Sequence, residues 1–320
     1  MTFALAAARS GSRSAALMVM HGTAIPLESA GEKRTVLELL DGWAGAYAGL
    51  QAIAADAALW RDAAPLDGLD LAAPYVPRQV FCTGANYRKH VIGLIMGDPS
   101  MRSPGDEAAT EEERRARAET LMDERAKADL PYCFIKLPSC VVGPQDDVVL
   151  PRNVSKPDWE LELGVVIGRR ARHVRAQDAM QHVAGYAVVN DVTAREHIFR
   201  RDGSAIGADW LSGKCFPTFL PFGPLIVPRE FVANPYDLVI SLSVNGRVFQ
   251  NETTADMMIG IERQIEFLSD RLVLLPGDVI CTGSPYGNGS AFGVFLKPGD
   301  VMEGEITGLG RQVNRCVAEA

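Results

Sequence analysis

The stretch DWELELGVVI, residues 158–167, carries the pattern on which both the fold class and the site depend. Side chains alternate between the two faces of a β-strand, so Glu160 and Glu162 share one face and the leucines between and after them take the other. Two carboxylates without a partner on one face repel each other, and a bound or neighbouring cation usually offsets this repulsion. The stretch therefore predicts a strand with a cation site, and its alternative is an edge strand with an exposed polar face.

A second apolar strand ends in polar residues within GYAVVNDVTAR, residues 185–195. A carboxylate at Asp191, at the end of a buried strand, is costly unless it is paired or bound to a metal. Asp191 is therefore the natural third ligand beside Glu160 and Glu162. Three carboxylates without His or Cys partners favour a hard cation, Mg²⁺ or Mn²⁺, with positions left for water and substrate.

Short apolar runs separated by turn signals dominate the chain beyond residue 130. Strands are expected at 133–136, 148–150, 161–167, 184–189, 238–244, 279–281 and 301–306, and helices at 176–182 and 258–271. The Asn-Gly pair at 245–246 indicates a hairpin. This pattern predicts a β-rich α+β domain rather than a regular βαβ array. The glycines at 283–293 lack the strand and helix context of a dinucleotide site.

The first 77 residues differ from the rest in composition. They are rich in Ala and Leu, with a strand-like run at 16–20, a turn at 21–22 and helical patterning over 35–57. Pro74 and Pro77 bracket an extended link before the next strand. We expect a small N-terminal α+β domain, residues 1–77, and a larger domain, residues 78–320.

The segment 97–130 interrupts the larger domain and is strongly charged. Thr110 followed by Glu113 forms a capping box, and oppositely charged residues recur at i,i+4 spacing. These features predict a solvated helix in a surface insertion. A lid over a site is the alternative, with residues 96–113 as its mobile part.

Composition excludes several classes of protein. The chain has 320 residues, 47% of them hydrophobic, and a formal net charge of −8 without a Lys/Arg-rich run. This balance argues against binding to nucleic acid. No apolar run reaches the roughly 18 residues of a membrane-spanning helix. The six cysteines show no C-x-x-C spacing, so we expect reduced cysteines in a cytoplasmic protein.

Six ordered motifs resemble those of the fumarylacetoacetate hydrolase family. They are NYRKH at 86–90, FIK at 134–136, ELE at 160–162, NDVTAR at 190–195, GKCF at 213–216 and TGSP at 282–285. The resemblance covers residues 80–317 apart from the insertion. It implies the β-rich fold of that family, Mg²⁺ or Mn²⁺ on the three carboxylates, and a small anionic 2-keto or 1,3-diketo acid as substrate. We also expect a homodimer.

The same resemblance implies roles for further residues. His90, expected in a loop-like stretch after a strand, would be the general base, and Lys214 would act with it in catalysis. Lys136 and Arg195 would help to neutralise the substrate's anionic groups. The remaining donors to the substrate carboxylate would be the hydroxyl of Thr282 and the backbone of Gly283.

Three departures from the family pattern bear on the reaction. Many small hydrolases of the family carry a glutamate three residues after the motif histidine, where this chain has Gly93. Glu107 or Glu111 of the insertion would be candidate replacements. A glutamine usual after the second motif aspartate is Ile198 here, and an aspartate after the G-K-x-F motif is Pro217.

These observations favour a metal-dependent hydrolase that cleaves a C–C bond in an acylpyruvate-like β-diketo acid, in the catabolism of aromatic compounds or sugar acids. The alternative is a lyase or isomerase on the same scaffold, either a 2-keto-3-deoxy sugar acid dehydratase or a tautomerase of an unsaturated hydroxydioate. A third reading is a metal-stabilised binding protein without catalysis, which would have no use for His90 and Lys214.

Overall fold

The computed structural model describes residues 2–11, 13–97, 109–128, 130–199 and 207–320. Its centre is a six-stranded sheet with the order β15-β12-β11-β18-β6-β7. The strands are β15 Val227–Pro228, β12 Val183–Asn190, β11 Leu161–Ile167, β18 Val279–Cys281, β6 Val80–Gly84 and β7 Tyr132–Lys136. Each strand that the sequence predicted in this sheet is present, and β11 is buried along its whole length.

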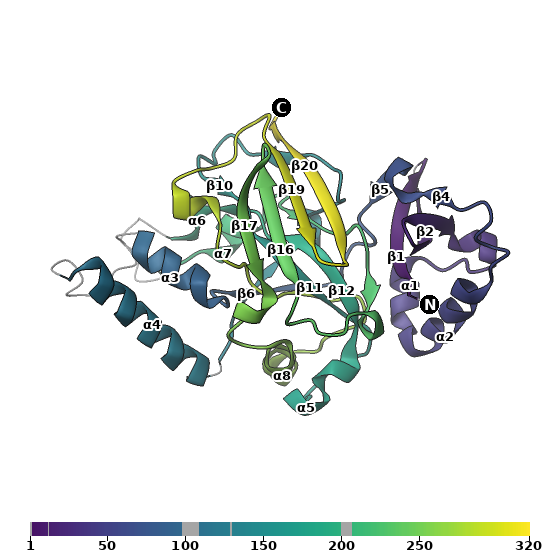
Figure 1. Ribbon diagram of the computed structural model, residues 1–320, viewed down its shortest axis with the longest axis horizontal. Coiled ribbons are helices and arrows are strands. Elements are labelled where there is room, and N and C mark those ends of the chain that lie inside the picture. The colour runs from purple at the N-terminus through teal and green to yellow at the C-terminus, as the bar shows by residue number, and fades with distance from the viewer. Residues whose placement is uncertain (1, 12, 98–108, 129, 200–206) are drawn as a thin grey trace.

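A five-stranded sheet packs against this central sheet (Figure 1). It has the order β17-β16-β19-β20-β9. The strands are β17 Arg247–Thr253, β16 Val239–Val244, β19 Val301–Ile306, β20 Gly310–Ala318 and β9 Val148–Leu150. Leu161 and Leu163 of β11 share one apolar core with Ile240, Leu242 and Ile306 of the outer sheet. The turn at Asn245 and Gly246 joins β16 to β17, as the Asn-Gly signal predicted.

Shorter elements complete the larger unit. The helices are α5 Ala176–Ala179, α6 Arg195–Ile198, α7 Trp210–Lys214 and α8 Ile261–Arg271, and the short strands are β8 Val141–Val142, β10 Pro157–Asp158, β13 Thr193–Ala194 and β14 Leu220–Pro221. Helix α8 begins three residues later than predicted because Gly260 is its N-cap. Helix α7 is the short element that places Lys214 beside the central sheet.

The N-terminal unit is a second five-stranded sheet covered by two helices (Figure 1). Its elements are β1 Ala4–Ser10, β2 Arg13–Met20, β3 Thr23–Pro26, β4 Ala64–Pro65, β5 Leu71–Ala72, α1 Val36–Asp41 and α2 Trp43–Ala55. The predicted helical stretch 35–57 is thus two helices that meet at Gly42.

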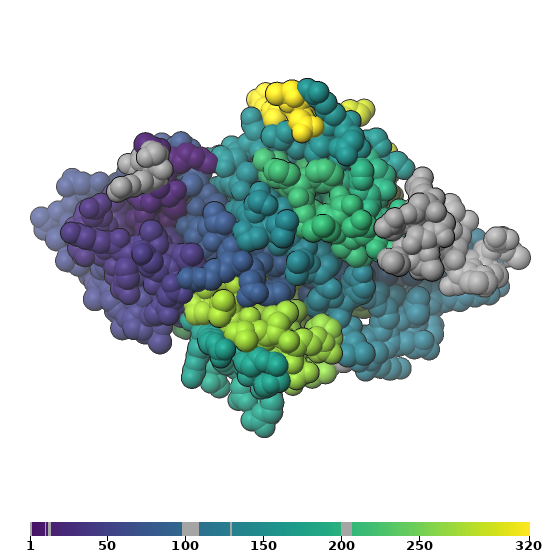
Figure 2. Space-filling view, turned by 180° about the vertical axis from the view of Figure 1, so that it is seen from behind, coloured from purple at the N-terminus to yellow at the C-terminus, as the bar shows by residue number. Residues whose placement is uncertain are grey.

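The N-terminal unit shares its core with the larger one. Leu5 and Met18 pack in one apolar cluster with Val166 and Val189 of the central sheet. The backbone amides and carbonyls of Leu5 and Ile226 exchange hydrogen bonds of 2.9 and 2.8 Å. The surfaces of the two units adjoin in the view from behind (Figure 2). The boundary at residue 77 stays a prediction.

Helices α3 Arg88–Gly97 and α4 Glu111–Ala128 lie side by side at one edge of the molecule (Figure 1). Thr110 and Glu113 form the predicted capping box at the start of α4. Only Ala118 and Met122 of α4 are buried, against apolar residues of α3. The predicted solvated helix is therefore confirmed. Most of the proposed lid, at 98–108, lies outside the described residues.

Candidate functional site

The ends of β11 and β12 bring three carboxylates together. The strands are antiparallel with Leu161 opposite Asn190. The Asp191 amide donates to the Glu160 carbonyl at 2.8 Å, and the Glu160 amide donates to the Asn190 side chain at 2.9 Å. One carboxylate oxygen from each of Glu160, Glu162 and Asp191 lies within 4.8 Å of the others, and all three residues are buried. The predicted ligand set is therefore assembled by strand register.

Two buried lysines contact this cluster directly. The Lys214 ammonium lies 2.5 Å from Glu160 Oε2 and 2.6 Å from Asp191 Oδ2. Lys136 Nζ lies 2.7 Å from Asp191 Oδ1 and donates to the Val192 carbonyl at 2.9 Å. Since Lys136 ends β7 and Lys214 ends α7, segments far apart in the sequence converge here.

Arg195 connects the cluster to Asp158, a residue for which we predicted no role. Arg195 lies 2.6 Å from Glu160 Oε1 through one guanidinium nitrogen and 2.7 Å from Asp158 Oδ2 through Nε. Asp158 is fully buried and also accepts from the amides of Gly289 and Ser290 at 2.6 and 3.0 Å. Asp158 thus fixes both the arginine and the loop that follows β18. The only sequence signal was an aspartate at the start of a buried strand.

The charges act unequally on the two glutamates. Burial opposes ionisation of Glu160, but Arg195 and Lys214 outweigh it and lower the pKa of its carboxyl. Burial raises the pKa of Glu162 well above its usual value, and the charge of Asp191 adds to the effect. A cation beside Glu162 would remove this repulsion. The carboxylate set therefore fits Mg²⁺ or Mn²⁺, which prefer oxygen ligands.

His90 lies in the first turn of α3, so the expected loop at this position is wrong. The helix begins at Arg88. Just before it, the Asn86 side chain donates to the carbonyls of Ile259 and Thr282 at 3.0 and 2.8 Å, which ties the start of α3 to two distant segments. Burial lowers the pKa of His90 to about 4, although Glu160 acts in the opposite direction. The imidazole is therefore neutral at pH 7, as a general base must be.

Thr282 and Gly283 line the site, but their donors hold protein groups. The Thr282 hydroxyl donates to the Leu163 carbonyl at 3.0 Å, and the Gly283 amide donates to Glu162 Oε2 at 2.8 Å. Gly283 has φ +103°, and a Cβ there would lie 2.9 Å from that of Asn86. The glycine is thus required for this approach, and substrate binding by the two residues stays a prediction.

Tyr286 fills the space beside Gly93. A Cβ at position 93 would lie 2.6 Å from Cε2 of the Tyr286 ring, so any side chain there would displace the ring. Because Gly93 follows His90 by three residues on α3, the two share a face of the helix. Glu111 is exposed at the start of α4, and Glu107 lies outside the described residues. Among the described residues of the insertion, no acidic side chain lies next to His90.

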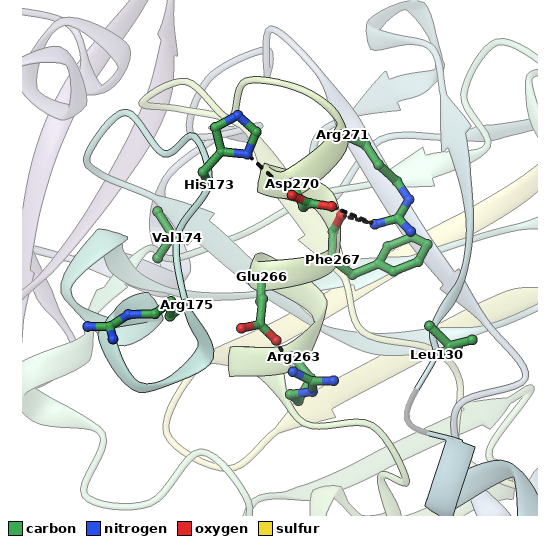
Figure 3. Close-up of a pocket in the computed structure, with 9 residues that line it drawn as sticks. All are labelled: Leu130, His173, Val174, Arg175, Arg263, Glu266, Phe267, Asp270 and Arg271. Carbon is green, nitrogen blue, oxygen red and sulfur yellow. Dashed lines mark hydrogen bonds and ion pairs between the residues drawn. The ribbon is translucent and has the colours of Figure 1, made fainter.

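A surface pocket of about 320 Å³ lies elsewhere, beside α8 (Figure 3). Most of its charged side chains pair with one another: His173 and Arg271 with Asp270, and Arg263 with Glu266. Arg175 pairs with Asp178, outside the lining. None of the three clustered carboxylates lines it. The candidate site is the buried cluster, not this pocket.

Comparison with known proteins identifies a family model and several curated relatives that match this chain. The family model described as "Fumarylacetoacetate (FAA) hydrolase C-terminal" matches residues 79–317. A mitochondrial oxaloacetate tautomerase of Homo sapiens is 46% identical over 189 residues, which are 58% of this chain and 59% of that protein. One of Rattus norvegicus is 36% identical over 243 residues, 75% of this chain and 67% of that protein. The matched part thus spans about 59% of the human relative's length.

Solved structures match over nearly the whole chain. A fumarylacetoacetate hydrolase from Exiguobacterium antarcticum is 26% identical with a TM-score of 0.74, covering 99% of this chain and 100% of that one. A 2-hydroxyhepta-2,4-diene-1,7-dioate isomerase from Mycobacterium marinum is 26% identical with a TM-score of 0.67 and full coverage of both chains. The maleylpyruvate hydrolase of Sphingobium sp. SYK-6, solved with manganese(II) and pyruvate, shares the fold at 23% identity, with a TM-score of 0.72 over 99% of this chain and 100% of that one.

Proposed function

The chain belongs to the fumarylacetoacetate hydrolase family, and from that premise we propose that it is a metal-dependent keto–enol tautomerase of a small 2-keto diacid, with oxaloacetate as the substrate to test first. The observation that carries the proposal is the buried, neutral His90 beside a carboxylate cluster, with a tyrosine ring where a partner glutamate would stand. A neutral imidazole suits proton transfer at carbon, and the ring of Tyr286 takes the place of the glutamate that would assist the activation of water. The names of the relatives agree with this choice.

Glu160, Glu162 and Asp191 would hold Mg²⁺ or Mn²⁺. When bound, such an ion supplies Lewis-acid stabilisation of the negative charge that develops on an enolate oxygen. The buried charges also suit an anionic substrate. Four carboxylates face three cationic side chains, so a divalent ion turns the balance of the cluster positive. The carboxylates are those of Asp158, Glu160, Glu162 and Asp191, and the cations are Lys136, Arg195 and Lys214.

His90 and Lys214 would have different roles: His90 would transfer the proton, and Lys214 would bind the anionic substrate. The neutral imidazole takes a proton from the carbon between the two carbonyl groups and holds it until it is returned to oxygen, so the substrate changes tautomer without loss of an atom. Lys214, already at the carboxylate cluster, places a positive charge where the anion binds. Lys136 and Arg195 position the carboxylates, and Thr282 and Gly283 complete the wall that faces the substrate carboxylate.

Cleavage of a C–C bond in an acylpyruvate-like acid is the second candidate. The same cluster and the same base serve it, and a hydrolase needs in addition a water molecule activated beside His90. The ring of Tyr286 over Gly93 occupies the position from which a glutamate would assist that step. This packing is why we rank tautomerisation first.

The experiment follows both reactions with one protein sample. Ketonisation of freshly dissolved enol-oxaloacetate is monitored by loss of enol absorbance, with Mn²⁺ and with excess EDTA, while acylpyruvates are incubated separately and their products identified by NMR. We expect Mn²⁺-dependent ketonisation that EDTA abolishes, and no cleavage of acylpyruvates. Two acids formed from one acylpyruvate would favour the hydrolase, and Mn²⁺ binding without turnover of any substrate would favour a binding protein.

Assembly and location are also proposals. We propose a homodimer, for which exposed apolar side chains such as Val239 and Val248 on the outer sheet provide surface, and light scattering of the purified protein measures its mass. No helix among the described residues is long and apolar enough to cross a bilayer. We propose a cytoplasmic location, although the names of the human and rat relatives place those proteins in mitochondria. Fractionation of the source cells tests this.

A further inference from the structure

Two of the six cysteines lie side by side next to the site. Cys140 ends a short 3₁₀ turn, Pro138–Cys140, and Cys215 directly follows α7. Their thiols are hydrogen-bond partners. Cys140 Sγ lies 4.0 Å from the Lys214 carbonyl oxygen, and Cys215 Sγ lies 3.7 Å from the Ile135 carbonyl oxygen. The pair therefore bridges the segment after β7 and the end of α7.

The two thiols differ in exposure and acidity. Cys140 is fully buried, whereas Cys215 is partly exposed. The hydrogen bond from Cys140, more than any other cause, lowers the pKa of Cys215 to about 6, and the same contact, with burial, raises the pKa of Cys140. The accessible sulfur is thus the more acidic of the two. This is the arrangement of an attacking and a resolving cysteine.

We propose that Cys140 and Cys215 form a hydroperoxide-sensitive thiol pair, and that closing it to a disulfide slows the enzyme. The Cys215 thiolate attacks the outer oxygen of the hydroperoxide and becomes a sulfenic acid, while the other oxygen leaves as an alcohol or water after taking up a proton. The Cys140 sulfur then displaces hydroxide from the sulfenic acid, and the released proton and hydroxide form water. The two thiols are oxidised by two electrons and the peroxide is reduced.

The position of the pair explains why oxidation would reach the site. Lys214 immediately precedes Cys215, and Lys136 lies four residues before Cys140. Both lysines contact Asp191. A bond between the two sulfurs pulls the segments that carry these lysines toward each other. A shift of about 1 Å in such a group is enough to cost up to about 10²-fold in rate.

A second cysteine pair provides the internal contrast. Cys82 and Cys281 lie opposite each other on the parallel strands β6 and β18. Both are fully buried, and burial is the main reason why the pKa of Cys82 is raised well above its usual value. Both pairs are close in space, but only the pair at Cys215 combines this proximity with a partly exposed sulfur of lowered pKa. Cys82 and Cys281 should stay reduced.

The test treats the purified full chain with hydrogen peroxide and maps its peptides without reduction. We expect one new disulfide, between the peptides that contain Cys140 and Cys215, with a loss of two hydrogens that dithiothreitol reverses. We also expect turnover to fall by about tenfold or more on oxidation and to recover on reduction. Mapping does not depend on the substrate, so it decides the pairing even if the protein does not act on oxaloacetate; the effect on turnover rests on the proposed function.

Variants make the result specific. Cys140→Ser and Cys215→Ser should each prevent the disulfide and remove the reversible loss of activity. Cys133→Ser is the matched control, since Cys133 is partly buried and its sulfur contacts Thr83 rather than a thiol, and it should behave as the wild type. Oxidation of Cys215 to sulfinic acid without a bond to Cys140, a disulfide between Cys82 and Cys281 alone, or a Cys140–Cys215 disulfide that leaves turnover unchanged would each overturn the proposal.

Discussion

The carboxylate cluster at β11 and β12 and the helical hairpin of α3 and α4 each contain an ion pair between a basic and an acidic side chain. The pair in the cluster is buried, and the pair in the hairpin is exposed. The side chains of Lys214 and Glu160 are 2% and 7% exposed, whereas those of Arg88 on α3 and Asp123 on α4 are 34% and 57% exposed. Loss of one partner from a buried pair costs about 3–5 kcal/mol, while an exposed pair contributes about 0–1 kcal/mol. The contrast teaches that burial, rather than pairing, separates a candidate site from a solvated surface.

The largest effect should follow from removing a ligand. Glu160→Gln, Glu162→Gln and Asp191→Asn should each abolish Mn²⁺ binding in calorimetric titrations, because each removes one of three charged ligands for a hard cation. Glu162→Gln is the cleanest variant, since Glu162 accepts from the Gly283 amide and forms no ion pair within the part of the chain that the structure describes. Asp123→Asn in the hairpin is the control and should bind as the wild type. Unchanged affinity in all three site variants would refute the metal assignment.

The next largest effect should come from His90. His90→Ala should lower turnover by about 10²- to 10⁴-fold, the usual contribution of a positioned acid–base group, and leave Mn²⁺ affinity nearly unchanged. His21→Ala, at an exposed turn, is the matched control and should keep full activity. Kinetics with saturating Mn²⁺ measures both. An unchanged rate in His90→Ala would remove this residue from the mechanism.

The part of the cluster that could be predicted from the sequence depends on patterns between neighbouring residues, namely the alternation of side chains along a strand and the position of a polar residue after an apolar run. The alternation at Glu160 and Glu162 and the carboxylate after an apolar strand at Asp191 specify their strand positions, and the register of β11 with β12 does the rest. The buried runs of the central sheet were predictable for the same reason. The charged repeat that marks α4 as solvated is also local.

What could not be predicted depends on contacts between distant segments. Nothing near Asp158 in the sequence shows that it holds Arg195 and the amide of Gly289. The start of the helix that carries His90 is anchored by Asn86, whose side-chain amide donates to the Ile259 carbonyl from another part of the chain. Nor does a glycine at position 93 reveal that the ring of Tyr286 covers it. These contacts decide the environment of the base, and hence the reaction, without leaving a pattern in the sequence.

A smaller effect should follow from removing the buried lysine. Lys214→Met should lower kcat/KM by about 10²-fold, with changes in both kcat and KM, because the charge faces the anion in the ground state and in the transition state. Lys89→Met is the matched control: its ammonium pairs with Glu252 on the surface, at 2.6 Å, and its loss should leave kcat/KM unchanged. A loss of thermal stability in Lys214→Met with normal kinetics would reassign Lys214 to a structural ion pair.

The smallest effect should be found in the hairpin of α3 and α4, where the ion pair is exposed and should contribute little to stability. Arg88 pairs with Asp123, and its guanidinium also donates to the Glu119 carbonyl at 3.3 Å, so it joins α3 to α4 at the surface. Both side chains remain hydrated, and water and salt screen their attraction. A double-mutant cycle of Arg88→Ala and Asp123→Ala, measured by urea unfolding, should give a coupling free energy below about 1 kcal/mol that decreases with added salt. Turnover should stay at the wild-type level in both variants, because neither residue is part of the carboxylate cluster. A coupling of several kcal/mol, or a rate loss similar to that of His90→Ala, would show that the hairpin belongs to the site after all, and the distinction between the two regions would fail.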